Sequence, residues 1–232
     1  LRRLSGGAPF DPSLHNVVVD GRGPELARAN GLQVIEQASG PEWRYIALDA
    51  TAAYRGRLQQ FRRAILYVEP DLFVLHDHLV AKEPVSFQML LHPPVATVLD
   101  TNWGDLRLDS SRGGFRIHAP GKRNMVRAWK RVESVADSLL PGTMTMQLGP
   151  TNKLTQIDVL TVFAVYRAGG NHSYAFKLLE SPNAIGARIH RAGLPTLVAF
   201  KTDPAAGSAS LTGFGFSGPV GVSAFKPKQK TP

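Results

Sequence analysis

The sequence contains no cysteine among its 232 residues, so disulfide bonds, thiolate metal ligands and cysteine nucleophiles are all excluded. It also lacks any apolar run close to the roughly 20 residues that a membrane-spanning helix needs. Acidic residues are scarce: 18 Asp and Glu stand against 27 Lys and Arg, a formal net charge of +9. Charge therefore favours polyanions, such as acidic polysaccharide or nucleic acid, as partners, and we expect no membrane partner.

Long helical patterns are also missing. Glycine (22) and proline (17) separate short apolar runs, which indicates many turns and few helices. Only residues 25–30 and 133–140 have even a brief helical pattern. With 43% apolar residues, the chain can bury a core, and we expect one domain over residues 1–225 followed by a basic tail at 226–232. Because the chain begins at Leu1 without Met or a leader, we expect it to be part of a longer protein.

Short runs of β-branched and aromatic residues, each closed by Gly, Pro or Asn, predict antiparallel strands. The first covers residues 15–21 and ends in Asp20-Gly21, a pair typical of turns. Further strands are expected at residues 43–48, 61–68, 73–80, 85–92, 106–108, 115–118 and 125–132. Residues 157–166 are apolar at successive positions, which predicts a central strand buried on both faces. The expected fold class is all-β: a layered antiparallel β-sandwich with few short helices.

Histidines are the first candidates for chemistry. His76 and His78 stand two apart on an expected strand, so their side chains share one face. A zinc site needs three or four N, O or S ligands, and a pair supplies only two. Leu75, Asp77 and Leu79 occupy the other face, a mixed pattern that fits a half-exposed strand as well as a metal site. We prefer the interpretation without a metal.

Arginine is abundant in the middle of the chain. On a strand, Arg127, Trp129 and Arg131 share a face, and they are the candidate substrate-binding residues. Guanidinium binds carboxylate or sulfate bidentately, while indole stacks on a sugar. The alternative is a solvated outer face with one partly buried tryptophan. Single-stranded nucleic acid would use similar groups, but no recognisable RNA- or DNA-binding motif accompanies them, so nucleic acid is the weaker alternative.

Catalytic motifs are absent from the sequence. It contains no glycine-rich loop between a strand and a helix, no Gly-x-Ser-x-Gly and no close carboxylate pair. We therefore assign no catalytic residue to this chain.

The segment His15-Asn16-Val17-Val18-Val19-Asp20-Gly21 resembles the HNT-hydrophobic-V-D-G motif in the C-terminal domain of heparinase II/III-like polysaccharide lyases. The resemblance continues in the same order through Tyr54 and through residues 62–77, which are similar to the family's RR-containing hairpin. His92 is similar to the histidine that closes the family's next strand. The resemblance thus covers about residues 15–92, and the remainder matches only in its β-rich character.

The resemblance implies a β-sandwich that packs against an N-terminal (α/α) toroid of the same chain, with the substrate between them. It implies β-elimination in uronic-acid polysaccharides, such as a glycosaminoglycan or alginate. The catalytic Tyr, His and Asn lie largely on the toroid, so this chain would form one wall of the cleft and be inactive alone. A periplasmic or extracellular location follows from that substrate class. The alternative from another class is a non-catalytic carbohydrate-binding or structural sandwich.

The resemblance also implies a zinc ligand. In the family, the HNT histidine joins an upstream His-x-Asp motif in holding a zinc ion with a mostly structural role, and this role carries over to His15. The partner ligands would precede Leu1, and Val17 stands where the family has Thr. The other interpretation of His15 is a hydrogen-bonded histidine at the start of a strand.

Overall fold

The structure is a computed structural model that describes residues 17–21, 32–54, 56–91, 99–100, 105–110, 113–118, 125–132, 143–168, 174–191 and 194–224. Strands dominate these residues, and one short 3-10 helix, η3 (Thr51–Tyr54), interrupts them. The described part of the chain includes no helix that is long and apolar enough to cross a membrane. The all-β fold class expected from the sequence is confirmed.

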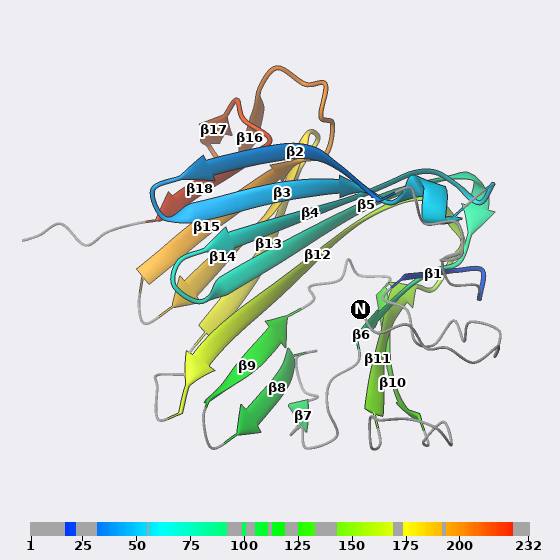
Figure 1. Cartoon of the computed structure of the whole chain (residues 1–232), viewed down its shortest axis with the longest axis horizontal. Helices are drawn as coiled ribbons and strands as arrows, with labels where there is room; N and C mark the ends of the chain where they lie inside the picture. The colour runs from blue at the N-terminus through cyan, green and yellow to red at the C-terminus, as the bar shows by residue number, and fades with distance from the viewer. Residues whose placement is uncertain are drawn as a thin grey trace, which may run out of the picture.

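The middle layer is an eight-stranded antiparallel sheet (Figure 1). Its order is β2-β3-β4-β5-β12-β9-β8-β7. The strands are β2 (Gln33–Gly40), β3 (Trp43–Asp49), β4 (Leu58–Val68), β5 (Leu72–Val85), β12 (Leu154–Arg167), β9 (Gly113–His118), β8 (Asp105–Ser110) and β7 (Leu99–Asp100). The predicted central strand is confirmed, because β12 lies between β5 and β9.

Two four-stranded sheets accompany the middle layer (Figure 1). One has the order β1-β6-β11-β10, with β1 (Val17–Val19), β6 (Phe87–Leu91), β11 (Thr143–Pro150) and β10 (Met125–Val132). The other has the order β13-β14-β15-β18, with β13 (Tyr174–Ser181), β14 (Ala184–Arg191), β15 (Leu194–Lys201) and β18 (Val220–Ala224). A small hairpin, β16 (Ala209–Leu211) and β17 (Phe214–Phe216), lies between β15 and β18 in sequence.

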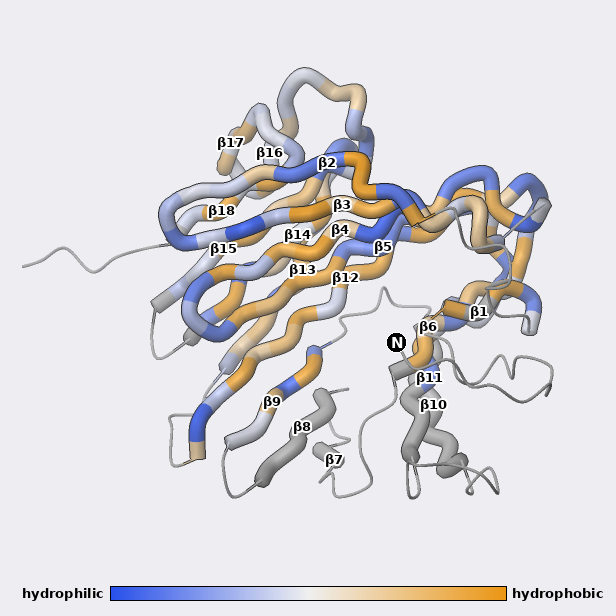
Figure 2. Tube along the Cα trace, viewed as in Figure 1, coloured by the Kyte–Doolittle hydropathy of each residue, from blue (hydrophilic) through white to orange (hydrophobic). Residues whose placement is uncertain are grey.

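Alternation along the middle strands explains why both faces of the large sheet are covered. Successive side chains of a strand point to opposite faces. Val74 and Val162 are buried with Ile189 and Val198 in the core shared with β13–β15. Leu79, Val159, Val19, Phe87 and Leu148 are buried in the core shared with β1, β6 and β11. Figure 2 shows the hydrophobic residues concentrated along β4, β5 and β12. The layered sandwich therefore has two cores that share one sheet.

The expected strand at 85–92 is divided at Ser86, where the chain passes from one sheet to the other. β5 ends at Val85 in the middle layer, and β6 begins at Phe87 in the four-stranded sheet. Asp20 fixes this corner: its backbone N–H donates to Ser86 O at 2.9 Å, and its carboxylate accepts from the Ser86 N–H at 2.8 Å. The predicted turn at Asp20-Gly21 is confirmed, with φ angles of 48° and 73°.

Some expectations fall on residues outside the described ranges. These are the brief helical patterns at 25–30 and 133–140 and the basic tail at 226–232. The division into one domain over residues 1–225 and a tail stays a prediction.

Candidate functional site

Polar side chains cross one face of the eight-stranded sheet, in a layer that is otherwise apolar. Strand pairing places Arg62 of β4 opposite His78 of β5, and His78 opposite Asp158 of β12. His76 stands two residues from His78 and therefore lies on the same face. We call the following set the polar row: Glu36, Tyr45, Arg62, His76, His78 and Asp158.

Asp158 binds both histidines through one oxygen atom. His76 Nε2 and His78 Nδ1 each lie 2.8 Å from Asp158 Oδ1. Burial raises the pKa of Asp158, but the hydrogen bonds and charges of the two histidines outweigh burial, so this pKa lies well below its usual range. Because an ionised carboxylate only accepts hydrogen bonds, both histidines donate to it.

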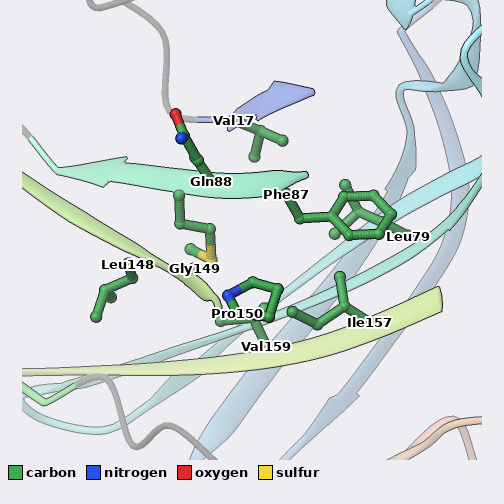
Figure 3. Close-up of a pocket in the computed structure, with 10 residues that line it drawn as sticks. Val17, Leu79, Phe87, Gln88, Leu148, Gly149, Pro150, Ile157 and Val159 are labelled. Carbon is green, nitrogen blue, oxygen red and sulfur yellow. The ribbon is translucent and has the colours of Figure 1, made fainter. Parts of the chain in front are cut away.

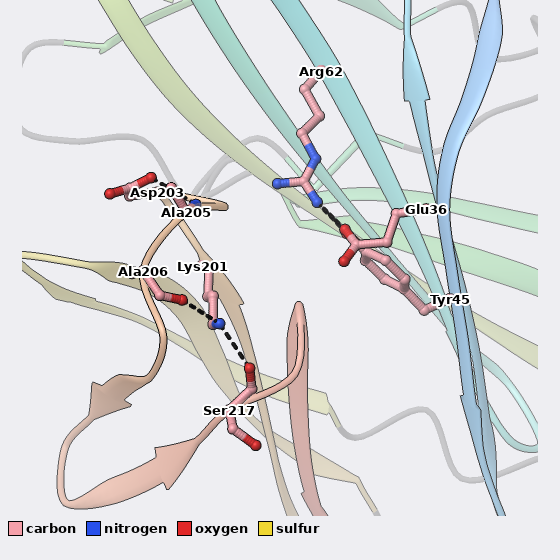
Figure 4. A network of polar contacts seen from close by, with 8 residues as sticks. All are labelled: Glu36, Tyr45, Arg62, Lys201, Asp203, Ala205, Ala206 and Ser217. Carbon is pink, nitrogen blue, oxygen red and sulfur yellow. Dashed lines mark hydrogen bonds and ion pairs between the residues drawn. The ribbon is translucent and has the colours of Figure 1, made fainter.

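Arg62 completes the other half of the polar row (Figure 4). Its Nη2 forms an ion pair with Glu36 and donates to Tyr45 Oη at 2.8 Å. Tyr45 in turn donates to Glu36 at 3.3 Å. Burial raises the pKa of Tyr45 above its ordinary value; Arg62 lowers this pKa and Glu36 raises it, each by less than burial does. Arg62 Nε is buried and has no hydrogen-bond acceptor among the described residues.

As placed, the polar row is an internal network. His76 is 4% exposed and His78 7%, and the ring of Phe200 lies 5.3 Å from that of His76. Among the described residues, no group of three or more His, Cys, Asp or Glu side chains could hold a metal ion. The predicted shared face of His76 and His78 is confirmed, and the partner of both is a carboxylate. Its side-chain contacts join β2, β3 and β4 in one half and β5 and β12 in the other.

Lys201, at the end of β15, is a second buried cation (Figure 4). Its Nζ donates to the carbonyl oxygens of Ala206 at 2.6 Å, Gly207 at 3.3 Å and Ser217 at 2.7 Å. Lys201 therefore holds the loop after β15 against the end of β17.

Arg63 and Asp77 form an ion pair on the opposite face of the same two strands, β4 and β5. Arg63 Nε lies 2.6 Å from Asp77 Oδ1 and Nη2 lies 2.8 Å from Oδ2, a bidentate geometry. Asp77 is fully buried. Burial lowers the pKa of Arg63, but the Asp77 carboxylate outweighs burial and raises it. The pair locks the hairpin that carries the two histidines.

A small hollow opens between the two sheets that enclose Phe87 (Figure 3). Val17, Leu148 and Ile157 line it together with other residues, none of which carries a charge. Apart from Gln88 the lining is apolar, and it offers no cation to an acidic polysaccharide, so we assign this hollow to core packing and not to substrate.

The structure places the predicted binding residues on one strand. Arg127, Trp129 and Arg131 stand at alternate positions of β10, opposite Leu148, Met146 and Met144 of β11. β10 is an edge strand of its four-stranded sheet. Their role in binding stays a prediction. The predicted zinc ligand His15 lies outside the described residues.

Sequence reasoning missed most members of the polar row. Asp158 had a visible signal, because it is the one charged residue between Lys153 and Arg167 in an apolar segment. Glu36 and Tyr45 carried no comparable signal, since their pairing with Arg62 depends on the order of β2, β3 and β4.

Comparison with solved structures gives this chain a known fold. It matches the crystal structure of the heparan sulfate lyase HepC from Pedobacter heparinus with a TM-score of 0.65 and 10% identity, over 83% of this chain and 31% of that chain. It matches a crystal structure titled heparinase III with a TM-score of 0.58 and 14% identity, over 81% and 29% of the two chains. No protein-family model and no curated protein matches the sequence.

These likenesses confirm, at the level of the fold, the resemblance to a heparinase II/III-like β-sandwich. The chain spans about 30% of the length of these solved proteins, as expected of one domain of such an enzyme.

Proposed function

We propose that this chain is the C-terminal β-sandwich domain of a polysaccharide lyase that cleaves a uronic-acid-containing polysaccharide by β-elimination. The observation that carries the proposal is the fold likeness to HepC over 83% of this chain. Two sequence features support it: the motif order in residues 15–92 and the formal charge of +9, which attracts an acidic chain.

The proposed reaction breaks a 4-linked glycosidic bond beside a uronate. A base removes the C5 proton, the C4–oxygen bond breaks, a C4–C5 double bond forms, and the leaving oxygen takes up a proton. The C5 proton is weakly acidic, so the reaction needs a base within about 3 Å and cationic or hydrogen-bonding groups at the uronate carboxylate. No residue of this chain is assigned as the base; a helical toroid of the same protein would supply it.

This domain would contribute one wall of the substrate cleft. Arg127, Trp129 and Arg131, at alternate positions of the edge strand β10, are the residues that we propose to bind the acidic chain. A structural zinc ion bound by His15 and by an upstream His-x-Asp motif of the same protein belongs to the same proposal. A periplasmic or extracellular site of action follows from the substrate class.

An activity assay on the full-length protein tests the proposal. The protein would be incubated with heparan sulfate, alginate and an uncharged glucan, and the ultraviolet absorbance of unsaturated uronate would be followed. We expect absorbance to rise with one acidic polysaccharide and to stay flat with the glucan. Replacement of Arg127 and Arg131 by Ala should raise KM more than it lowers kcat, because these residues bind and do not react.

The alternative, a non-catalytic carbohydrate-binding or structural sandwich, predicts a different result. In that case, the full-length protein would bind at least one acidic polysaccharide but would form unsaturated product from none of those tested. Such a result would overturn the lyase proposal.

A further inference from the structure

A row of one arginine and three aromatic residues crosses the face of the eight-stranded sheet opposite to the polar row. Strand pairing places Arg44 of β3 opposite Tyr67 of β4, Tyr67 opposite Phe73 of β5, and Phe73 opposite Phe163 of β12. We call these four residues the aromatic row. Directly paired residues of neighbouring strands lie on the same face, so the row is continuous over four strands.

The aromatic row is open at its centre, unlike the cores on either side of the sheet. Phe73 is 39% exposed, and Val165, two residues beyond Phe163 on β12, is 43% exposed. The rings of Tyr67 and Phe73 stack with centroids 4.8 Å apart and an interplanar angle of 29°. Phe163 is partly buried against the core shared with β1, β6 and β11, so the exposed part of the row is centred on Phe73.

Charge and shape point to the class of ligand. Arg44 Nη1 donates to the carbonyl oxygens of Gly40 at 2.7 Å and Trp43 at 2.8 Å, which holds the exposed guanidinium at one end of the row. Arg44 has no carboxylate partner among the described residues. Neighbouring strands lie about 4.8 Å apart, so the row from Arg44 to Phe163 is roughly 14 Å long. A narrow track of flat rings that ends in a cation suits a short run of pyranose rings with a carboxylate or sulfate.

The nearest carboxylates lie at the turns beside the row. Glu42 and Glu69 belong to the β2–β3 and β4–β5 turns, where the Glu69 N–H donates to Glu42 O at 2.8 Å. Asp71 accepts a hydrogen bond from Tyr174 Oη at 3.2 Å. Glu42 stands two residues from Arg44, and the Asp71 carboxylate is engaged by Tyr174, so Arg44 is the cation of the row.

We propose that the aromatic row is a second binding surface for acidic polysaccharide, separate from the strand that carries Arg127, Trp129 and Arg131. The apolar C–H faces of the sugar rings stack on Tyr67 and Phe73, and Arg44 pairs with a carboxylate or sulfate. The surface holds a long polymer on the protein. The inference takes its ligand class from the proposed function but does not need this protein to be a lyase.

Affinity electrophoresis tests the proposal, with alginate, heparan sulfate or an uncharged glucan cast into native gels. One acidic polysaccharide should retard the wild-type protein. Phe73→Ala and Arg44→Ala should each raise the Kd for that polysaccharide roughly tenfold. Phe73→Leu keeps an apolar side chain but removes the ring, so it should weaken binding as Phe73→Ala does. Thermal unfolding of each variant confirms that it is folded.

Two matched controls separate this surface from general charge and apolar effects. Arg188→Ala removes an exposed cation from β14, and Leu154→Ala removes a side chain that is 36% exposed at the other end of β12. Neither control should change retardation. Equal losses in Arg44→Ala and Arg188→Ala would overturn the proposal, as would unchanged binding by Phe73→Ala.

A lyase assay distinguishes this inference from the proposed function. In an active enzyme, Phe73→Ala should lower activity on long polymer and leave activity on short oligosaccharides unchanged. If Phe73→Ala lost the same fraction of activity on long polymer and on short oligosaccharides, the aromatic row would not be a separate binding surface. If the full-length protein forms no unsaturated product but Phe73→Ala still loses retardation, the aromatic row is upheld as a binding surface and the lyase proposal fails.

Discussion

At the scale of single residues, a few buried charges organise the molecule. Asp158 accepts hydrogen bonds from His76 and His78, and Asp77 is held by Arg63 on the other face. Each charge is paired within the sandwich, as burial of an ion requires. These residues carry the most direct predictions about stability.

Asp158 should make folding sensitive to acid. Its pKa in the folded protein lies below the ordinary 3.8, so the unfolded chain binds the proton more readily. The stabilisation is complete above the ordinary pKa and is lost as pH falls below it towards the folded pKa. At neutral pH, the free energy of unfolding of Asp158→Asn, measured with urea, should be lower than that of the wild type by about 1–3 kcal/mol. Below about pH 4, this free energy should fall less steeply with pH in Asp158→Asn than in the wild type.

Glu83→Gln is the control for Asp158→Asn, because Glu83 is exposed on β5. Its pH profile should match that of the wild type. An acid slope in Asp158→Asn as steep as that of the wild type would contradict the role given to Asp158.

Lys201 should stabilise the loop after β15. Lys201→Met leaves the carbonyl oxygens of Ala206, Gly207 and Ser217 without their donor, which should lower the free energy of unfolding by about 1–3 kcal/mol. Urea unfolding measures the change, and Lys177→Met, at an exposed lysine of β13, is the control. If the two variants lose equal stability, the three carbonyl contacts contribute nothing.

Residue types and spacing predicted part of the polar row. Two-residue periodicity correctly placed His76 and His78 on one face of a strand. Their shared partner was not predictable, because Asp158 is 80 residues from His78 and reaches it only through the pairing of β5 with β12.

At the scale of elements, the β4–β5 hairpin is the centre of the middle sheet. Its two strands carry Arg62, His76 and His78 on one face and Arg63 and Asp77 on the other. Opposite faces therefore contribute separate networks to the same pair of strands.

The Arg63–Asp77 pair should lock that hairpin. Arg63→Met leaves the Asp77 carboxylate buried and unpaired, which should cost about 3–5 kcal/mol. The double variant Arg63→Met with Asp77→Leu removes both charges and should recover much of the loss. Urea unfolding of the two single variants and the double variant measures the coupling between the residues. Simple addition of the single losses would show that the pair is not coupled.

Local pattern predicted apolar strands in the first part of the chain, including β4, β5 and β12, but missed β2, β11 and the whole sheet β13-β14-β15-β18. The segment at 157–166 was predicted as a strand buried on both faces, because no helix pattern competes with it. β2 was not predicted, since Gln33, Glu36, Gln37 and Ser39 give it a polar composition, and its place in the sheet depends on pairing with β3. The corner at Ser86 was also missed, because a change of sheet leaves no mark in local hydropathy.

At the scale of the whole molecule, three layers share two cores, and this arrangement is similar to the fold of part of the heparan sulfate lyase HepC. The sequence predicted the layered β class and the resemblance. The sequence could not predict the number of strands in each sheet, because strand order depends on pairs far apart in the chain. The proposed function belongs to this scale, since the catalytic residues would come from another domain.

Oxygen labelling of the reaction products tests the central claim most directly. The full-length protein would digest its acidic polysaccharide in water enriched in oxygen-18, and mass spectrometry would weigh the fragments. β-Elimination adds no water, so we predict unlabelled fragments that end in an unsaturated uronate. Fragments that gain one labelled oxygen for each broken bond would show hydrolysis and would contradict the account, as would an absence of cleavage in every acidic polysaccharide tried.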